Sequence, residues 1–453
     1  MICLSDDPAA TPAGQTLREV FAARASIVHI MAVEAALARV QARHCLIPAA
    51  AAADISAKAS LAFFPTAEWS RQRARVGHPL VAILEAWMTR LEPGSREWLH
   101  YGATTADLFN TVLILQLQQA GTRLLEQMHD VGLRLAEMAG AYRATPMVAR
   151  TLGRHAQPIT FGMKVGVWLA EHGRSIERLQ AWLARYRTGI LSGAVGTYAA
   201  FGDQGPSIER EVMAELGLDA PEAVDWKGSR DRYAEFGCAV ALAARTCGHI
   251  GQEIFLLSGD DLDEVRETNG AVGSSTMPHK ANPSLCIEVV SRSREVSARL
   301  LPLLEWILVV YERDSAQHGD VLRDLCVGMA DLLACLRQLL DTLVVLPQNM
   351  AANLQRSRGM ILSEAITFAL AEHIGKHSAH IAMRQLVAVA RQRNCSLQEA
   401  ARDSEEFKTL FAERPELLEV AHYIGRAPDI ADAAVAAASL RAMPGAFKPL
   451  GKA

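Results

Sequence analysis

The sequence has few aromatic residues, no basic tract and no hydrophobic run long enough to cross a membrane. Aromatic residues make up 6% of the 453 residues, although 50% are hydrophobic. No run reaches the roughly 18 consecutive apolar residues of a membrane helix. Lysine and arginine are dispersed, and the formal net charge is −4. We therefore expect no membrane segment and no partner that is bound through general positive charge, such as nucleic acid.

The eight cysteines also lack a metal-binding or redox pattern, because none forms a C-x-x-C pair or a zinc-like cluster. Residues 1–8 carry acid and no long apolar core, which is unlike a signal peptide. These features predict a cytoplasmic protein with reduced thiols rather than disulfides or a metal site. Cys238 and Cys247 lie in apolar helical sequence and are expected to be small core residues.

Apolar residues recur at steps of three and four over most of the chain, which predicts an all-α protein with few strands. The expected helices cover residues 15–44, 50–60, 80–90, 104–141, 161–188, 230–257, 284–312, 318–345, 358–393 and 397–412. A polar turn is expected at 148–162, and glycines interrupt the helices at 193–206. The near-continuous apolar content of residues 300–310 predicts burial all round, at the centre of a bundle or between subunits.

These segments group into three predicted domains. Residues 1–105 form a small N-terminal helical domain, residues 106–346 form a central bundle of long helices, and residues 347–453 form a small C-terminal helical domain. The boundaries follow the helix breakers, since glycine and proline end or interrupt a helix.

One stretch, residues 269–283, interrupts the helical pattern and carries several polar groups. Gly270 and Gly273 loosen the backbone, while Pro278 and Pro283 disfavour helix on their N-terminal sides. Between these breakers lie two hydroxyls, one cation and one amide: Ser274, Ser275, Lys280 and Asn282. Such a segment suits a lid that closes over an anionic substrate. An ordinary polar surface loop is the alternative.

A second polar stretch precedes the helix expected at 104–141. Its hydroxyls and its carboxylate (Thr104, Thr105, Asp107) suit a helix N-cap, where free N–H groups also favour an anion. Ordinary capping is the alternative. His100 places a titratable ring beside this helix start.

Residues 273–283 resemble the signature loop of the fumarase/aspartase superfamily, Gly-Ser-Ser-x-Met-Pro-x-Lys-x-Asn-Pro. Residues 98–107 are similar to its motif His-x-Gly-x-Thr-Ser-x-Asp. Residues 230–232 match the Arg-Asp-Arg of the branch that holds adenylosuccinate lyase and 3-carboxy-cis,cis-muconate cycloisomerase. Residues 17–21 and 421–426 look most like the cycloisomerase. The resemblance covers nearly the whole chain.

The resemblance implies a three-domain, all-helical fold whose long helices form a 20-helix core in a homotetramer, with each active site shared among three subunits. Members of this superfamily remove a proton beside a carboxylate and expel a leaving group, or run the reverse addition. The doubly charged aci-carboxylate intermediate must be surrounded by prearranged donors. The expected substrate is thus a small succinate- or muconate-like polycarboxylate, handled without a cofactor.

Roles can be carried over residue by residue. Ser274 matches the serine that acts as base, while Lys280 and Asn282 match positions that bind the carboxylate, with Thr104 and Thr105 across the site. The other expected substrate-binding residues are Thr151, Gln157, Ser229, Arg232, Ser275, Met277 and Arg313. Lys280 could instead be a surface charge, and Arg313 could be paired structurally.

The chain also departs from the pattern of adenylosuccinate lyases and fumarases. Leu152 stands where those enzymes have a histidine that helps to protonate the leaving group. His155 occupies the place of a later histidine in the cycloisomerase, so His155 and His100 are the candidate acids, with structural roles as the alternative. Ser229 replaces a glutamine that contacts the substrate carboxylate. Arg154 is an extra cation near the second motif.

The sequence therefore predicts a lyase-type enzyme most similar to the muconate cycloisomerase. A C–N lyase that splits an N-substituted aspartate to fumarate is the first alternative, because residues 311–318 resemble adenylosuccinate lyase more closely. An inactive structural homologue is the second alternative.

Overall fold

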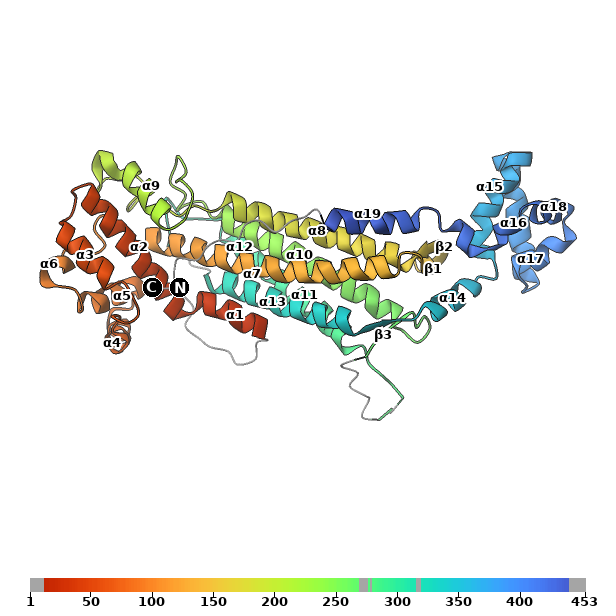
Figure 1. Ribbon diagram of the computed structural model, residues 1–453, viewed down its shortest axis with the longest axis horizontal. Coiled ribbons are helices and arrows are strands. Elements are labelled where there is room, and N and C mark those ends of the chain that lie inside the picture. The colour runs from red at the N-terminus through yellow and green to blue at the C-terminus, as the bar shows by residue number, and fades with distance from the viewer. Residues whose placement is uncertain (1–11, 269–275, 278, 315–318, 440–453) are drawn as a thin grey trace.

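The computed structural model describes residues 12–268, 276–277, 279–314 and 319–439, which form an elongated and mainly helical molecule (Figure 1). The expected all-α class is confirmed. Ser274 and Ser275 lie outside the described residues, so their positions stay predictions.

Long helices that lie side by side make up the centre of the molecule (Figure 1). They are α7 (Thr105–Ala141), α8 (Phe161–Arg185), α10 (Asp231–Leu257), α11 (Ser284–Ala298) and α13 (Gly319–Thr342). At 1.5 Å per residue, α7 alone spans roughly 55 Å. Its buried stripe, which includes Val112, Leu115 and Leu135, belongs to one large apolar core that also contains the N-terminal helices.

Most of the N-terminal helices lie at one end of this bundle, whereas the first of them packs along α13 (Figure 1). They are α1 (Pro12–Phe21), α2 (Ala23–Arg43), α3 (Ala49–Ala57), α4 (Thr66–Val76), α5 (Pro79–Met88) and α6 (Pro93–Arg96), joined by η1 (Gly202–Gln204) and α9 (Gly205–Glu215) from later in the chain. The single helix expected at 15–44 is two helices, because the chain adopts an extended conformation at Ala22. Helices α4 and α9 were not expected; the apolar pattern of α4 is weak, and none of its residues is buried.

The opposite end holds short helices with a second apolar core. Its elements are α14 (Pro347–Gln355), η2 (Met360–Leu362), α15 (Ser363–Ile374), α16 (Lys376–Gln392), α17 (Leu397–Ala400), η3 (Ala401–Asp403), α18 (Glu405–Glu413), η4 (Pro415–Leu418) and η5 (Val420–Tyr423). The last helix, α19 (Ala427–Ser439), returns to pack on α7 and α8. The three-domain division stays a prediction.

In the part of the chain that the structure describes, four short strands form two antiparallel pairs. Strand β1 (Pro146–Thr151) pairs with β2 (Arg154–Thr160), and β3 (Val265–Glu267) pairs with β4 (Leu343–Val345). The polar turn expected at 148–162 is thus mostly a β-hairpin. A bulge between Val148 and Arg150 interrupts the β1–β2 register. That irregularity breaks the alternation by which a strand is recognised in sequence.

The helix expected at 284–312 is shorter in the structure. Helix α11 ends at Ala298, and α12 covers only Leu300–Glu305. Within this chain the apolar run after α11 is not buried all round, since Leu301 is 63% exposed and Leu308 is 76% exposed. Burial between subunits stays a prediction.

Residues Pro12–Arg43, which contain α1 and α2, are long and apolar enough to resemble a membrane helix by composition alone. Their most apolar window has a mean hydropathy of 1.6, and 61% of that window is buried inside the molecule. Burial of this kind is what a core helix produces.

Candidate active site

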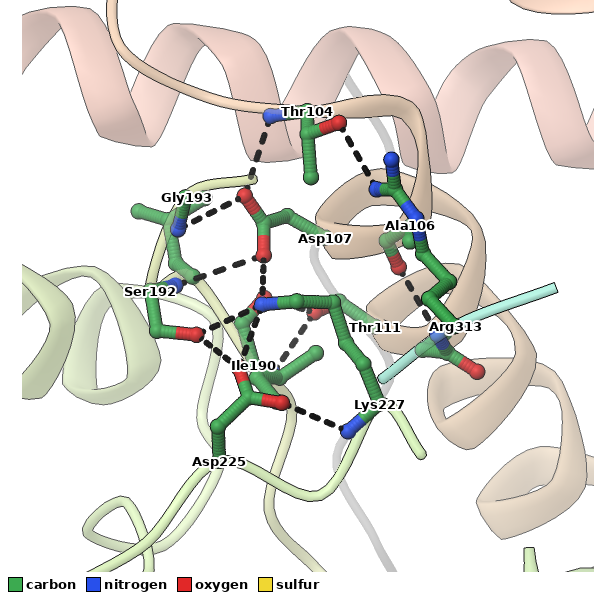
Figure 2. A network of polar contacts seen from close by, with 12 residues as sticks. Thr104, Ala106, Asp107, Thr111, Ile190, Ser192, Gly193, Asp225, Lys227 and Arg313 are labelled. Atoms are coloured by element: carbon green, nitrogen blue, oxygen red, sulfur yellow. Dashed lines mark hydrogen bonds and ion pairs between the residues drawn. The ribbon is translucent and has the colours of Figure 1, made fainter. Parts of the chain in front are cut away.

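The start of α7 carries the first group of expected site residues (Figure 2). Thr104 is the N-cap, and the carboxylate of Asp107 accepts a hydrogen bond from the Thr104 N–H at 3.0 Å, so the predicted capping is confirmed. Thr105 is the first residue of α7. The preceding loop has left-handed backbone at His100, with φ of 64°, and at Gly102, with φ of 78°. A non-glycine residue in this region is strained and is often found at a functional site.

A buried ion network lies directly beneath this helix start (Figure 2). Lys227 Nζ lies 2.9 Å from Asp107 Oδ1, 2.5 Å from Asp225 Oδ2 and 2.6 Å from Ser192 Oγ. The Lys227 and Asp107 side chains are 1% and 0% exposed. Burial raises the pKa of Asp107 despite its contact with Lys227. Burial also acts to raise the pKa of Asp225, but hydrogen bonds from Lys227 and Ser192 outweigh it and lower that pKa.

His100 pairs with a carboxylate from a different helix. Its Nδ1 lies 2.6 Å from Oε1 of Glu34, which belongs to α2 and has a side chain only 1% exposed. Burial acts to lower the pKa of His100, but the nearby charges of Glu34 and Asp107 outweigh it, so the pKa is raised. His100 is therefore held in the charged form more strongly than an ordinary histidine.

Arg313 is exposed and lies against the start of α7. Its Nη1 donates a hydrogen bond to Thr104 Oγ1 at 3.0 Å (Figure 2). The neighbouring residue, Asp314, is anchored by Arg230, whose guanidinium also lies over the ring of Trp306 at 5.0 Å. Arg230 of the Arg-Asp-Arg motif thus helps to position Arg313 through Asp314. Not every side chain of the motif faces the site.

The other arginine of that motif, Arg232, is buried. Its guanidinium lies 3.7 Å from the ring centroid of Trp226, and its Nη2 donates to Glu222 at 2.9 Å. Ser229, which follows the buried Lys227 by two residues, is exposed. In this chain Arg232 is held in packing contacts, while Ser229 is open to a ligand.

The second group of expected residues lies on the β1–β2 hairpin at the other end of α7 (Figure 1). Thr151 and His155 are exposed, and Leu152 is fully exposed at the hairpin turn with φ of 52°. Burial and the nearby Arg150 guanidinium lower the pKa of His155. Gln157 donates a hydrogen bond to Glu364, which also accepts from the Tyr423 hydroxyl at 3.0 Å.

The third group is the described part of the signature loop. Met277 and Lys280 are exposed, and Asn282 is half-buried. The C-terminal end of the loop is fixed by Glu267 of β3, whose carboxylate accepts the N–H groups of Leu285 and Cys286 at 3.0 and 2.8 Å. The expected anchoring at the proline end is thus supplied by a capped start of α11.

The structure of one chain does not bring the three groups together. The start of α7 and the β1–β2 hairpin lie at opposite ends of that helix, which is 37 residues long. Arg313 joins the first group, whereas Thr151, His155 and Gln157 belong to the second.

Several residues that support the site were missed by the sequence reasoning. Glu34 carried a usable signal, because it is the one acid in the long apolar segment 20–53. Lys227 lies in a polar loop where nothing in the spacing shows that it is buried. Glu364 and Glu267 contact residues distant in sequence, and no local pattern records such contacts.

Among the described residues, no group of three or more histidine, cysteine, aspartate or glutamate side chains could hold a metal ion.

A family model described as a lyase matches residues 19–297. The chain is 37% identical to N-acetyl-S-(2-succino)cysteine lyase of Enterococcus italicus, over 80% of this chain and 81% of that protein. It is 32% identical to adenylosuccinate lyase of Pyrococcus horikoshii, over 92% and 94%. It is 33% identical to 3-carboxy-cis,cis-muconate cycloisomerase of Pseudomonas aeruginosa, over 91% and 92%.

Among solved structures, fumarate lyase from Mesorhizobium sp. BNC1 superposes with a TM-score of 0.86 at 30% identity. That match covers 96% of this chain and 100% of the other.

Proposed function

This chain belongs to the lyase family of the fumarase/aspartase superfamily, and we propose that it releases fumarate from a succinate that carries a sulfur substituent. The reaction is a β-elimination. A base removes a proton from the carbon beside one carboxylate, the electron pair forms the C=C bond, and the C–S bond breaks with its pair going to sulfur. The products are fumarate and a thiolate, and the proton stays on the base until solvent takes it.

The residues keep the roles that the resemblance implies. Ser274 is the base, Lys280 and Asn282 hold the aci-carboxylate, and Thr104 with Arg313 binds the other carboxylate. The contact of Arg313 Nη1 with Thr104 Oγ1, at 3.0 Å, supports this pairing because it sets a cation beside the free end of a long helix.

The observation that carries the choice of leaving group is Leu152. The residue stands at the exposed tip of the β1–β2 hairpin, where a histidine would protonate the leaving group, and its side chain cannot donate a proton. An amine must be protonated as it leaves. A thiol, with an ordinary pKa of about 8.5, can leave as its anion. The similarity to a lyase named for a succinylated cysteine agrees with this choice.

Cycloisomerisation of a muconate is the second candidate, and Leu152 favours it too, because an internal carboxylate adds without any leaving group to protonate. The similarity of residues 17–21 and 421–426 to the cycloisomerase supports it. A C–N lyase ranks third, since it needs a proton donor that only His155 or His100 could supply.

The proposal includes a homotetramer in which each active site is shared among three subunits, in a cytoplasmic setting. The separation of the residue groups along α7 supports shared sites, because one chain cannot place both ends of that helix around one small substrate.

A substrate panel tests the proposal. We expect purified protein to release both fumarate, read by ultraviolet absorbance, and free thiol, read with a chromogenic disulfide, from an S-succinyl-N-acylcysteine. Ser274→Ala should abolish turnover without unfolding the protein. Ser70→Ala, which changes an exposed serine on α4, is the matched control and should keep full activity.

Other results would replace the proposal. Fumarate from N-substituted aspartates alone would identify a C–N lyase, and loss of carboxymuconate absorbance alone would identify a cycloisomerase. Calorimetric binding of dicarboxylates without turnover of any substrate would identify an inactive homologue. Full activity of Ser274→Ala would remove the proposed base.

A further inference from the structure

Glu34 is a buried carboxylate in an otherwise apolar part of α2. Its side chain is 1% exposed, while Ile30, Met31 and Leu37, which lie three or four residues away on the same helix, are at most 1% exposed. Burying a carboxylate is unfavourable unless a partner compensates its charge. The partner is His100, whose Nδ1 lies 2.6 Å from Glu34 Oε1.

The same helix face holds the backbone of the His100 loop. Two turns beyond Glu34, the fully buried Gln41 donates a hydrogen bond from Nε2 to the carbonyl oxygen of Tyr101 at 2.7 Å. Helix α2 therefore contacts the loop at two adjacent residues, His100 and Tyr101. These two contacts compensate for the unfavourable left-handed backbone at His100.

The His100 ring is partly accessible to solvent. The side chain is 21% exposed, and among the described residues Glu34 provides its one recorded hydrogen bond. Once Nδ1 is committed to Glu34, Nε2 is the nitrogen left for a ligand.

The charges around His100 come from two helices and one loop. Glu34 on α2 and Asp107 on α7 both favour the imidazolium, and the pKa of His100 is raised although burial acts against it. Lys227, a buried cation that contacts Asp107, is neutralised by its pairs with Asp107 and Asp225. Arg313 also lies at this helix start, where it contacts Thr104.

We propose that Glu34 is a positioning residue, which orients His100 through Nδ1 and keeps it charged so that Nε2–H binds a carboxylate of the substrate. The inference deepens the proposed function, because it assigns to His100 the recognition of a dicarboxylate rather than the protonation of a leaving group. A charged donor fixed in this way forms a stronger hydrogen bond to a carboxylate than a neutral one. It needs no reorganisation during the reaction.

The test distinguishes the effect of the negative charge of Glu34 from its effect on the orientation of His100. Glu34→Gln keeps an oxygen that accepts the Nδ1–H bond, but it removes the negative charge. We expect fumarate binding, measured by calorimetry, to weaken about tenfold at pH values above the ordinary histidine pKa of about 6.5, and to change little below it. As pH rises, kcat/KM of the variant should begin to fall at a lower pH than kcat/KM of the unaltered protein. Binding of fumarate does not require turnover, so this result stands or falls separately from the proposed reaction.

Gln41→Met is the matched control. It removes the hydrogen bond from α2 to the Tyr101 carbonyl oxygen without changing the charge near His100. We expect it to weaken fumarate binding by the same factor at every pH. If Glu34→Gln behaves like Gln41→Met, or leaves binding unchanged at all pH values, Glu34 is structural only and the inference is wrong.

A further variant covers the case in which Glu34→Gln does not fold. Fumarate binding to the unaltered protein should weaken as pH rises through the raised pKa of His100. His100→Gln should remove this pH dependence. Identical pH dependence in the two proteins would overturn the inference.

Discussion

Replacement of Lys227 by methionine should strongly destabilise the protein. Lys227 Nζ contacts Asp107, Asp225 and Ser192 at 2.5–2.9 Å, and the side chains of Lys227 and Asp107 are buried. Methionine has nearly the same length and can fill the space of the lysine stem. The expected loss therefore comes from the two carboxylates that remain, and not from a cavity.

The magnitude follows from the burial of those groups. Removing one partner of a buried ion pair typically costs about 3–5 kcal/mol, because the other charge is left without compensation. Asp107 is 0% exposed and keeps only the N–H groups of Thr104, Ser192 and Gly193, at 3.0–3.3 Å. Asp225 is 20% exposed and recovers part of its hydration. We expect a loss near the middle of that range.

The assay is urea unfolding followed by circular dichroism, at one protein concentration because association also affects stability. Lys164→Met is the matched control. Lys164 pairs with Glu253, but the two side chains are 21% and 28% exposed, so its loss should cost at most about 1 kcal/mol. Adding Asp107→Asn to Lys227→Met should restore part of the stability. If Lys227→Met is no less stable than Lys164→Met, the reasoning about the buried network is refuted.

Three further predictions follow. Glu264→Gln should cost about 3 kcal/mol in the free energy of unfolding, since the fully buried Glu264 takes two hydrogen bonds from Arg150 at 2.8 and 3.0 Å; an unchanged urea midpoint would contradict this. Cys45 is exposed, whereas burial raises the pKa of Cys247 to about 12, so a thiol reagent should label Cys45 rapidly and Cys247 only on unfolding. His100 has a raised pKa, so its stabilisation relative to His100→Gln should be complete below about pH 6.5 and should fall as pH rises through that raised value.

Much of the fold could be predicted from the sequence because its longest helices have strong local signals. The start of α7 was predicted to within one residue, since Thr104 and Asp107 are local capping residues. The β1–β2 hairpin was missed because its bulge interrupts the strand alternation. The short α4 was missed because none of its residues is buried.

The candidate site likewise contains residues that a local sequence pattern reveals and residues that it does not. Residues in motifs, such as Thr104 and Arg313, could be proposed from sequence, although their 3.0 Å contact could not. Glu34 and Lys227 could not be assigned, because their roles arise from pairing with residues far away in the chain. Long-range pairing of this kind leaves at most a weak trace in sequence, such as a lone acid in an apolar helix.

The geometry of α7 leads to a last prediction about assembly. His100 precedes the start of this helix and Gln157 follows its end, so roughly 55 Å separates them along one chain. If both contribute to one active site, they must come from different subunits. His100→Gln and Gln157→Ala should each inactivate the enzyme, yet chains of the two variants that are unfolded and refolded together should regain about a quarter of the activity, because random assembly pairs two intact contributors at that frequency. Each variant refolded alone is the control. Without any recovery in the mixture, both residues would have to act within a single chain, and the shared site would be wrong.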